Sequence, residues 1–395
     1  MADVKKLWTW GSGANGRLGL GNTTDYSSPK QVGALTDWAS VSTSYGSSTG
    51  NADTAAVKTD GTLWTWGSGA AGRLGHGNTT AYSSPKQVGA LTNWASVSTG
   101  GPHTAAVKTD GTLWTWGRGV YGRLGLGNTT DYSSPKQVGT LTDWASSVSA
   151  SYQHTAAVKT DGTLWTWGRG TLGRLGHGNT TGYSSPKQVG ALPDWASSVS
   201  AGYQHTAAVK TDGTLWTWGE GGNGRLGLGN VTDYSSPKQV GALTNWSSVS
   251  SGTFHTAAVK TDGTLWTWGT GNYGRLGHGN TTTYSSPKQV GALTDWASVS
   301  AGWRHTAAVK TDGTLWTWGQ AGSGQLGLGN TTGYSSPKQV GALTNWSSVS
   351  TGGPHMVAIT LDAAAASATP SRIMRLFEGF TVKFVSGRII IHQKQ

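Results

Sequence analysis

The sequence has no cysteine and little glutamate, and these absences exclude several kinds of site. Without cysteine there are no disulfides, thiolate nucleophiles or thiolate metal ligands. Glutamate occurs only at Glu220 and Glu378. No apolar run approaches the ~20 residues that a membrane-spanning helix needs. The opening Met-Ala-Asp-Val-Lys-Lys leads directly into a strand-like segment and does not resemble a secretory signal. We therefore expect neither a membrane span nor thiol chemistry.

Glycine and tryptophan are abundant instead, with 62 and 22 residues, and most of them belong to an internal repeat. The segment Leu-Trp-Thr-Trp-Gly begins at Leu7, Leu63, Leu113, Leu164, Leu215, Leu265 and Leu315. A period of about 50 residues with several short strands in each unit is typical of a propeller or a solenoid.

One unit contains four strand candidates. Residues 103–109 and 112–117 flank Asp110-Gly111, and an Asp-Gly pair between two such runs predicts a hairpin with a two-residue type I′ turn. This turn would pair Val107 with Trp114 and Ala105 with Trp116. Residues 134–138 and 144–148 supply the other two strands. Four strands in about 50 residues predict one propeller blade.

The two ends of the repeat region favour a closed ring over a solenoid. The chain begins with the second half of the hairpin, at Leu7, and its repeats end with the first half, at His355–Asp362. The halves complete one hairpin only if the ring closes, and closure also removes exposed sheet edges. We therefore predict an all-β, seven-bladed propeller over residues 1–362.

The repeated Gly-x-x-His-Thr-Ala-x-x-Lys-x-Asp-Gly-x-Leu-Trp-x-Trp-Gly, followed by Gly-Arg-Leu-Gly, resembles the regulator-of-chromosome-condensation repeat. The resemblance extends over residues 1–362 and implies a seven-bladed propeller closed by its two termini. Such nearly identical copies are more similar to bacterial and bacteriophage members than to eukaryotic ones.

Three further features suggest activities that the repeat argues against. The net charge of +11 suggests nucleic acid, but the basic residues are spread around the units, so we do not expect nucleic acid as the main partner. The Gly-x-Gly-x-x-Gly at Gly11–Gly16 matches a dinucleotide motif without the helix that holds phosphate, so we expect no cofactor. His103 and its equivalents recur once in each unit, too far apart to share a metal. We interpret them as hydrogen-bonding strand residues.

Other histidines, His76, His177 and His278, alternate with Leu20, Leu126, Leu228 and Leu328 at a second repeat position, for which the sequence offers no explanation. No unit has a nucleophile, base and carboxylate that the others lack, so we do not expect an enzyme.

The units differ mainly in two segments, which a hairpin places at the same end. One precedes His-Thr and the other follows Trp-Thr-Trp-Gly. Both are rich in residue types that dominate interface binding energy. We therefore predict a partner-binding face that contains Tyr152, Gln153, Tyr203, Gln204, Phe254, Trp303, Arg304, Arg118, Tyr121, Arg169 and Tyr273. Neutral drift in tolerant loops is the alternative.

The composition changes after Asp362. We predict a linker over residues 363–371 and an assembly arm over residues 372–395. The arm would consist of a short helix that starts at Pro370, at the end of the linker, and a hairpin around Ser386-Gly387. Its apolar residues are Phe377, Phe380, Val382, Phe384, Ile389 and Ile391. An isolated hairpin is marginal in water, so we expect it to dock on a protein partner or a second copy.

Taken together, the sequence predicts a non-enzymatic scaffold with one variable face, located in a virion or the cytoplasm as part of a larger assembly such as a phage virion or a bacterial surface structure. Two alternatives remain open. One is a guanine-nucleotide-exchange or chromatin-binding regulator, as the resemblance implies for eukaryotic members. The other is a sugar-binding propeller that uses the repeated aromatic residues as equivalent pockets to bind a glycan.

Overall fold

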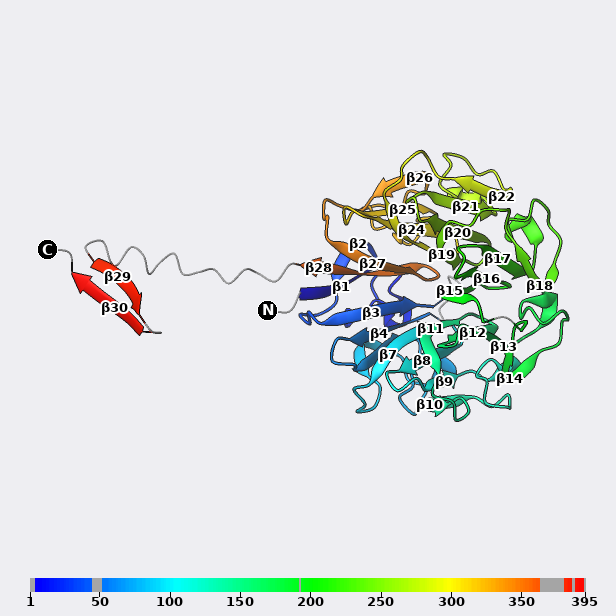
Figure 1. The fold of residues 1–395 in the computed structure, drawn as a ribbon, viewed down its shortest axis with the longest axis horizontal. Coiled ribbons are helices and arrows are strands. Elements are labelled where there is room, and N and C mark those ends of the chain that lie inside the picture. Colours follow the sequence, from blue (N-terminus) through cyan, green and yellow to red (C-terminus); the bar gives the residue numbers. More distant parts are fainter. Residues whose placement is uncertain (1–3, 45–51, 192, 363–379, 386–387, 394–395) are drawn as a thin grey trace. The chain divides into compact units, whose positions relative to one another are not determined.

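A computed structural model describes residues 4–44, 52–191, 193–362, 380–385 and 388–393 (Figure 1). Residues Lys5–Leu361 form one compact unit, and the hairpin near the C-terminus belongs to a second. The larger unit contains seven four-stranded antiparallel sheets arranged as the blades of a propeller. The predicted all-β, seven-bladed fold is therefore confirmed.

All blades have the same strand order. The first strand begins with tryptophan and contacts its equivalents in the neighbouring blades. The last strand, Tyr-Ser-Ser-Pro-Lys-Gln, lies at the outer edge. In this order the blades are β27 (Trp346–Thr351), β28 (His355–Asp362), β1 (Val4–Gly11) and β2 (Tyr26–Gln31); β3 (Trp38–Thr43), β4 (Asp53–Lys58), β5 (Leu63–Gly67) and β6 (Tyr82–Gln87); β7 (Trp94–Thr99), β8 (His103–Lys108), β9 (Leu113–Gly117) and β10 (Tyr132–Gln137); β11 (Trp144–Ala150), β12 (His154–Lys159), β13 (Leu164–Gly168) and β14 (Tyr183–Gln188); β15 (Trp195–Ala201), β16 (His205–Lys210), β17 (Leu215–Gly219) and β18 (Tyr234–Gln239); β19 (Trp246–Ser251), β20 (His255–Lys260), β21 (Leu265–Gly269) and β22 (Tyr284–Gln289); and β23 (Trp296–Ala301), β24 (His305–Lys310), β25 (Leu315–Gly319) and β26 (Tyr334–Gln339).

One-turn 3-10 helices follow the third strand in six units: η1 (Ala14–Gly16), η2 (Ala70–Gly72), η3 (Val120–Gly122), η4 (Thr171–Gly173), η5 (Gly222–Gly224) and η6 (Asn272–Gly274). They lie inside the Gly-x-Gly-x-x-Gly segments. A three-residue turn has no aligned helix dipole of the kind that binds a dinucleotide phosphate.

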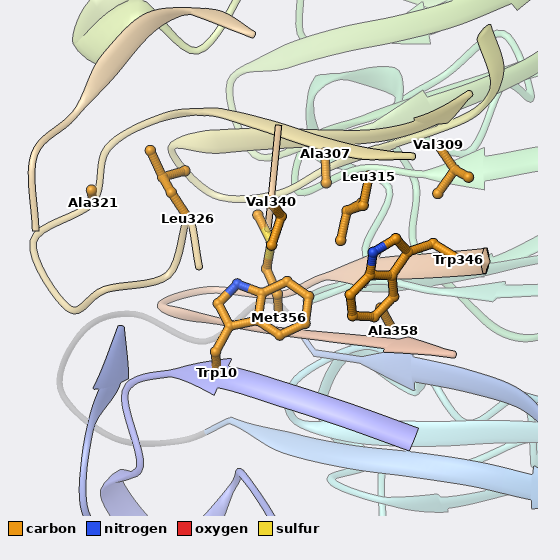
Figure 2. Packing of buried hydrophobic residues seen from close by; sticks show 10 residues of the cluster. All are labelled: Trp10, Ala307, Val309, Leu315, Ala321, Leu326, Val340, Trp346, Met356 and Ala358. Atoms are coloured by element: carbon orange, nitrogen blue, oxygen red, sulfur yellow. The ribbon is translucent and has the colours of Figure 1, made fainter. Parts of the chain in front are cut away.

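The ring closes through the two ends of the repeat region, as predicted. β28 lies between β27 and β1 in one sheet, and in Figure 1 the orange β28 runs beside the dark blue β1. The indole N–H of Trp8 donates to Thr360 Oγ1 at 3.0 Å. Figure 2 shows Trp10 from the first strand packed in a buried cluster with Met356 and Leu315. Closure therefore pairs the first strand of the chain with the last strand of the ring.

The hairpin register differs by one residue from the prediction. Ala106 pairs with Trp114, and Val107 pairs with Leu113. The reason is the turn: Lys108 N donates to Thr112 O, and Gly111 has a φ of +75°. The loop is thus a three-residue turn that ends in a left-handed glycine, a common alternative to the two-residue turn.

Adjacent blades are joined by tryptophans and by a hydrogen-bond relay. Trp167 is fully buried against the preceding blade, and its indole N–H donates to Arg123 O at 2.9 Å. A Cβ at Gly125 would lie 2.7 Å from this indole nitrogen, so only glycine fits there.

The histidines of the His-Thr segments form the relay. His154 Nε2 lies 2.8 Å from Thr206 Oγ1 of the next blade, and Thr206 Oγ1 donates to Arg174 O. Since the hydroxyl proton is used, the histidine must donate to it as the neutral Nε2–H form. Four other units have the same His–Thr contact, at 2.7–3.1 Å. His305 is the exception because Met356 stands where the other units have threonine. Their interpretation as hydrogen-bonding strand residues is confirmed in these five units.

The smaller unit contains the predicted C-terminal hairpin. β29 (Phe380–Val385) pairs antiparallel with β30 (Arg388–Gln393), and Val382 is the register partner of Ile391. The predicted linker and helix, including Phe377, lie outside the described residues.

Candidate interaction surface

The two variable segments of each unit are hydrogen-bonded to each other at one end of the hairpin. Arg118 N donates to Pro102 O at 2.9 Å, Arg169 N to Gln153 O at 3.0 Å and Gln320 N to Arg304 O at 2.9 Å. Neighbouring blades are also connected here, since Trp303 N donates to Gly352 O. We call this surface the loop face. It contains the predicted binding residues of both segments, while the Asp-Gly turns lie at the opposite strand ends.

Aromatic and arginine side chains from adjacent units meet on the loop face. The Arg169 guanidinium lies over the Tyr121 ring, with its Cζ 4.8 Å from the ring centroid. Tyr273 has an equivalent contact with Arg304, at 4.9 Å. These distances are typical of cation–π pairs, which contribute about 0.5–1 kcal/mol each at exposed sites. The predicted residues therefore form cross-unit contacts and are not isolated side chains.

Two patches result. The first joins Tyr121 and Arg169 and, beside them, Tyr152 and Tyr203, whose ring centroids are 5.0 Å apart. Burial raises the pKa of Tyr203 above its ordinary value. In the second patch, Arg304 lies 3.9 Å from the Trp303 ring centroid and contacts Tyr273.

Phe254 lies half-buried beside the second patch, between two buried arginines. Gln204 is half-buried, and its backbone carbonyl accepts from Glu220 N. Arg118 is exposed on the same face.

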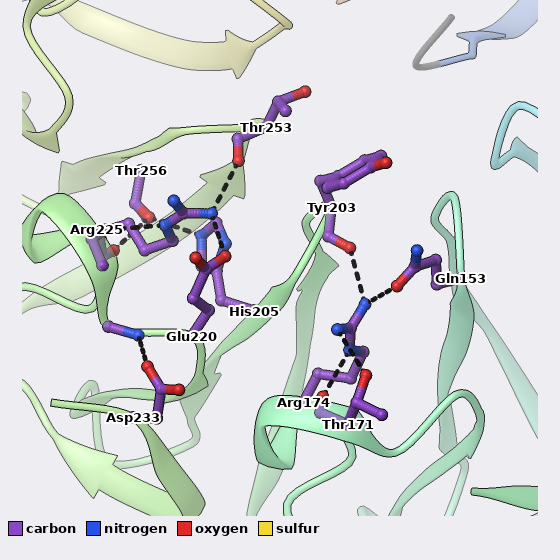
Figure 3. A network of polar contacts seen from close by, with 12 residues as sticks. Gln153, Thr171, Arg174, Tyr203, His205, Glu220, Arg225, Asp233, Thr253 and Thr256 are labelled. Carbon is purple, nitrogen blue, oxygen red and sulfur yellow. Dashed lines mark hydrogen bonds and ion pairs between the residues drawn. The ribbon is translucent and has the colours of Figure 1, made fainter.

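Buried arginines from the Gly-Arg-Leu-Gly segments hold the loop face in place (Figure 3). Arg123 Nη1 donates to the backbone carbonyl of Tyr152 at 2.7 Å, and Arg275 Nη1 donates to that of Trp303 at 3.2 Å. Both arginines are 2% exposed. Burial lowers the pKa of each to about 10, so both remain charged near neutral pH. The sequence motif had drawn attention to these arginines without indicating this role.

One predicted site residue is not available to a partner. Gln153 is buried, and its Oε1 accepts a hydrogen bond from Arg174 Nη1. Figure 3 shows this contact together with the one between Arg174 and the Tyr203 carbonyl. Gln153 therefore supports the loop face from below. The sequence could not reveal this, because the partner arginine lies 21 residues away.

Four exposed or half-buried loop residues adopt a backbone conformation that disfavours them. Ala71, Tyr121, Leu172 and Tyr273 have φ values of +57°, +66°, +63° and +63°, in the left-handed region. Asn15 and Asn223 occupy the same repeat position, and asparagine tolerates this region far better. A left-handed non-glycine residue costs about 1–3 kcal/mol and often marks a functional site. Tyr121 and Tyr273 are 46% and 48% exposed, so their burial does not offset this cost.

Among the residues that the structure describes, no three His, Asp or Glu side chains are close enough to hold a metal ion. No helix in the described part of the chain is sufficiently long and apolar to cross a membrane. Carboxylates near the loop face are engaged: Glu220 pairs with Arg225 at 2.8 Å, and Asp131 accepts from Gly119 N.

Comparison with known proteins identifies the family. The model of the RCC1-like domain matches residues 6–358. The ultraviolet-B receptor UVR8 of Arabidopsis thaliana is 36% identical over 245 residues, which are 60% of this chain and 54% of the receptor. The human E3 ubiquitin-protein ligase HERC2 is 32% identical over 238 residues, 60% of this chain but 4% of the ligase. The chain thus spans about half of one relative and a small part of the other.

The crystal structure of Prp20p from Saccharomyces cerevisiae superimposes with a TM-score of 0.78 at 20% identity, over 92% of this chain and 93% of Prp20p. At that identity the superposition shows a common fold. The family match extends over nearly the whole ring and confirms the resemblance in the repeats. The protein belongs to the RCC1-like domain family, whose propellers serve as protein-interaction or regulatory scaffolds.

Proposed function

We propose that this protein is a non-enzymatic scaffold that binds a protein partner through its loop face. The strained, exposed tyrosines carry this proposal. Asparagine tolerates this conformation at Asn15 and Asn223, whereas Tyr121 and Tyr273 place exposed aromatic rings there at a cost in stability. Cation–π contacts with Arg169 and Arg304 then fix the tyrosine rings, which reduces the entropy lost on binding.

The charge of the loop face favours a partner with an acidic surface. Arg118 is exposed and Arg169 and Arg304 are half-buried on this face, whereas Glu220 is paired with Arg225. Complementary charge increases the association rate and excludes cationic partners. Tyrosine, tryptophan and arginine are also the residue types that dominate binding energy in protein interfaces.

The test compares two variants in affinity purification from the source organism, followed by quantitative mass spectrometry. One replaces Tyr152, Tyr203, Trp303 and Arg304 with alanine. The control replaces Leu35, Leu243 and Leu343, which are 42–45% exposed, with alanine. The proposal predicts that one or more proteins are retained by the wild type and by the control but are lost from the loop-face variant. Equal retention by all three proteins would refute it.

The hairpin of β29 and β30 is proposed as the element that docks the propeller into a larger assembly, on a partner or on a second copy. Deletion of residues 363–395 should then change the assembly size measured by light scattering, without unfolding the ring. The near identity of the repeats suggested a virion or a bacterial surface structure. The relatives named above are eukaryotic and give that setting no support.

A regulator of the eukaryotic type is the second candidate, favoured by family membership. Prp20p, which shares the fold, has binding properties to Gsp1p and histones. If this chain acts in the same way, its addition should accelerate release of fluorescent GDP from a small GTPase or retain histones on a column. The engaged carboxylates of the loop face argue against nucleotide exchange through that face.

A further inference from the structure

A second type of site is repeated between the blades. Clefts of about 540, 420 and 510 Å³ adjoin His76, His177 and His278, and one of about 350 Å³ adjoins Leu126. Each lies between the outer strand of one blade and the strands of the next. The cleft at His76 is lined, among others, by Lys86, Gln87, Trp94, Trp114, Ser134 and Pro135. None of the loop-face residues lines these four clefts.

The cleft walls contain polar groups that have no partner in the described chain. The indole N–H groups of Trp94, Trp144 and Trp296 are buried and donate to nothing there. Trp94 and Trp296 belong to two of the histidine clefts, whereas Trp144 belongs to the cleft at Leu126. The side-chain amide of Gln87 is half-buried and makes no hydrogen bond among the residues described. The indole N–H groups have almost no accessible surface, so of these groups the Gln87 amide is the one that a ligand in the cleft can reach.

The histidines change the chemistry of their clefts. His76 Nε2 lies 2.9 Å from Thr65 Oγ1, and the imidazole packs edge-on against Tyr82 at 5.1 Å. Because Thr65 Oγ1 donates to Leu74 O, the imidazole donates to the hydroxyl. The Tyr82 hydroxyl in turn accepts from Lys86 Nζ at 2.8 Å.

The same lysine contact occurs at His177 and His278, and lysine lines all three histidine clefts. In the unit with Leu126, Lys136 lies farther from its tyrosine, with Nζ 5.6 Å from the Tyr132 ring centroid. This lysine does not line the cleft. Burial lowers the pKa of His76 and His278 to about 4, so these imidazoles are neutral at pH 7. The histidine clefts thus contain an imidazole and a lysine that the cleft at Leu126 lacks.

We propose that the three histidine clefts bind carbohydrate. A sugar ring has an apolar C–H face and a rim of hydroxyl groups that both donate and accept. Trp114 and Pro135 offer the apolar surface, while the glutamine amide and the lysine ammonium supply partners for hydroxyl groups. A small anion fits less well, because it would leave the apolar surface of Trp114 and Pro135 uncovered. Three equivalent sites on one rigid ring would bind a branched or polymeric glycan with avidity.

The chain itself provides matched variants for the test. Leucine occupies this position in four of the seven units, so H76L/H177L/H278L should keep the fold, as checked by circular dichroism. L126H is the reverse change and should create a fourth polar cleft. Both variants and the wild type are applied to a glycan array that contains glucose, galactose, mannose, fucose and N-acetylglucosamine termini. The strongest glycan is then titrated calorimetrically.

The proposal expects three sites in the wild type, four in L126H, and at least a tenfold loss of affinity in the triple variant. It is overturned if no glycan on the array binds, or if the triple variant binds like the wild type. The loop-face alanine variant should bind the same glycan unchanged. This separates a failure of the carbohydrate sites from a failure of the proposed loop-face function.

Discussion

Mild acid should unfold the ring, because six histidines are buried in the neutral form. His103, His154, His205, His255, His305 and His355 are fully buried. Burial lowers the pKa of each far below 6.5, to about 3 for His305. The unfolded chain therefore binds more protons than the folded one below pH 6.5. Stability is complete above that pH and is lost as the pH falls toward the folded-state values.

The size of the effect follows from this difference. At pH 5 each histidine removes about 2 kcal/mol, and the six together remove about 12 kcal/mol. Asp53 acts in the opposite direction, because burial raises its pKa to about 7. Its protonation between pH 7 and pH 5 returns about 2 kcal/mol. His76 and His278, with pKa values of about 4, remove about 4 kcal/mol more at pH 5. The histidines dominate, and the net loss of about 14 kcal/mol is comparable to the whole stability of a typical domain.

Urea unfolding followed by far-ultraviolet circular dichroism at pH 8, 7, 6 and 5.5 measures this loss. The slope at pH 5.5 should correspond to an uptake of about six protons on unfolding, including those of His76 and His278, and H154N should reduce it by about one. If the free energy of unfolding changed by less than about 1 kcal/mol between pH 7 and 5.5, the buried histidines would not be held neutral in the folded ring. That result would refute this prediction.

Three further variants test other parts of the structure. Thr206→Val leaves the His154 donor and the Arg174 carbonyl unpaired and should destabilise the ring by about 2–4 kcal/mol in urea unfolding, whereas a change below 0.5 kcal/mol would contradict the relay. Tyr121→Asn should raise stability by about 1 kcal/mol, because asparagine accepts the left-handed backbone, and should weaken partner capture; a loss of stability would contradict the strain. Asp53→Asn removes a buried carboxylate whose raised pKa makes the folded state less stable as the pH rises. The variant should therefore gain about 1 kcal/mol more unfolding free energy at pH 8 than at pH 6. An equal gain at both pH values would contradict the raised pKa.

Several features of this fold follow from short-range patterns. The repeated Asp-Gly between apolar runs predicts the hairpin, and the period near 50 residues predicts the blade. The split hairpin at Leu7 and His355 predicts closure, because a half-hairpin leaves its backbone groups unpaired. All of these depend on turn chemistry and periodicity, which are local properties. The register was wrong by one residue, because Gly111 makes a three-residue turn that the dipeptide alone does not distinguish.

The sequence by itself determined the number of blades, the closed ring and the end of the hairpins at which the copies differ. Only the tertiary structure decided which of the varied side chains are accessible. Gln153 is buried under Arg174, while Tyr121 and Tyr273 are exposed in a strained conformation. It also explains the alternation of His76 and its equivalents with leucine, through the contact that brings a lysine into the cleft. The physical reason is the same in each case. Burial and hydrogen bonding at these positions depend on groups brought close by the fold, and an indole, carbonyl or guanidinium far away in sequence leaves no local pattern.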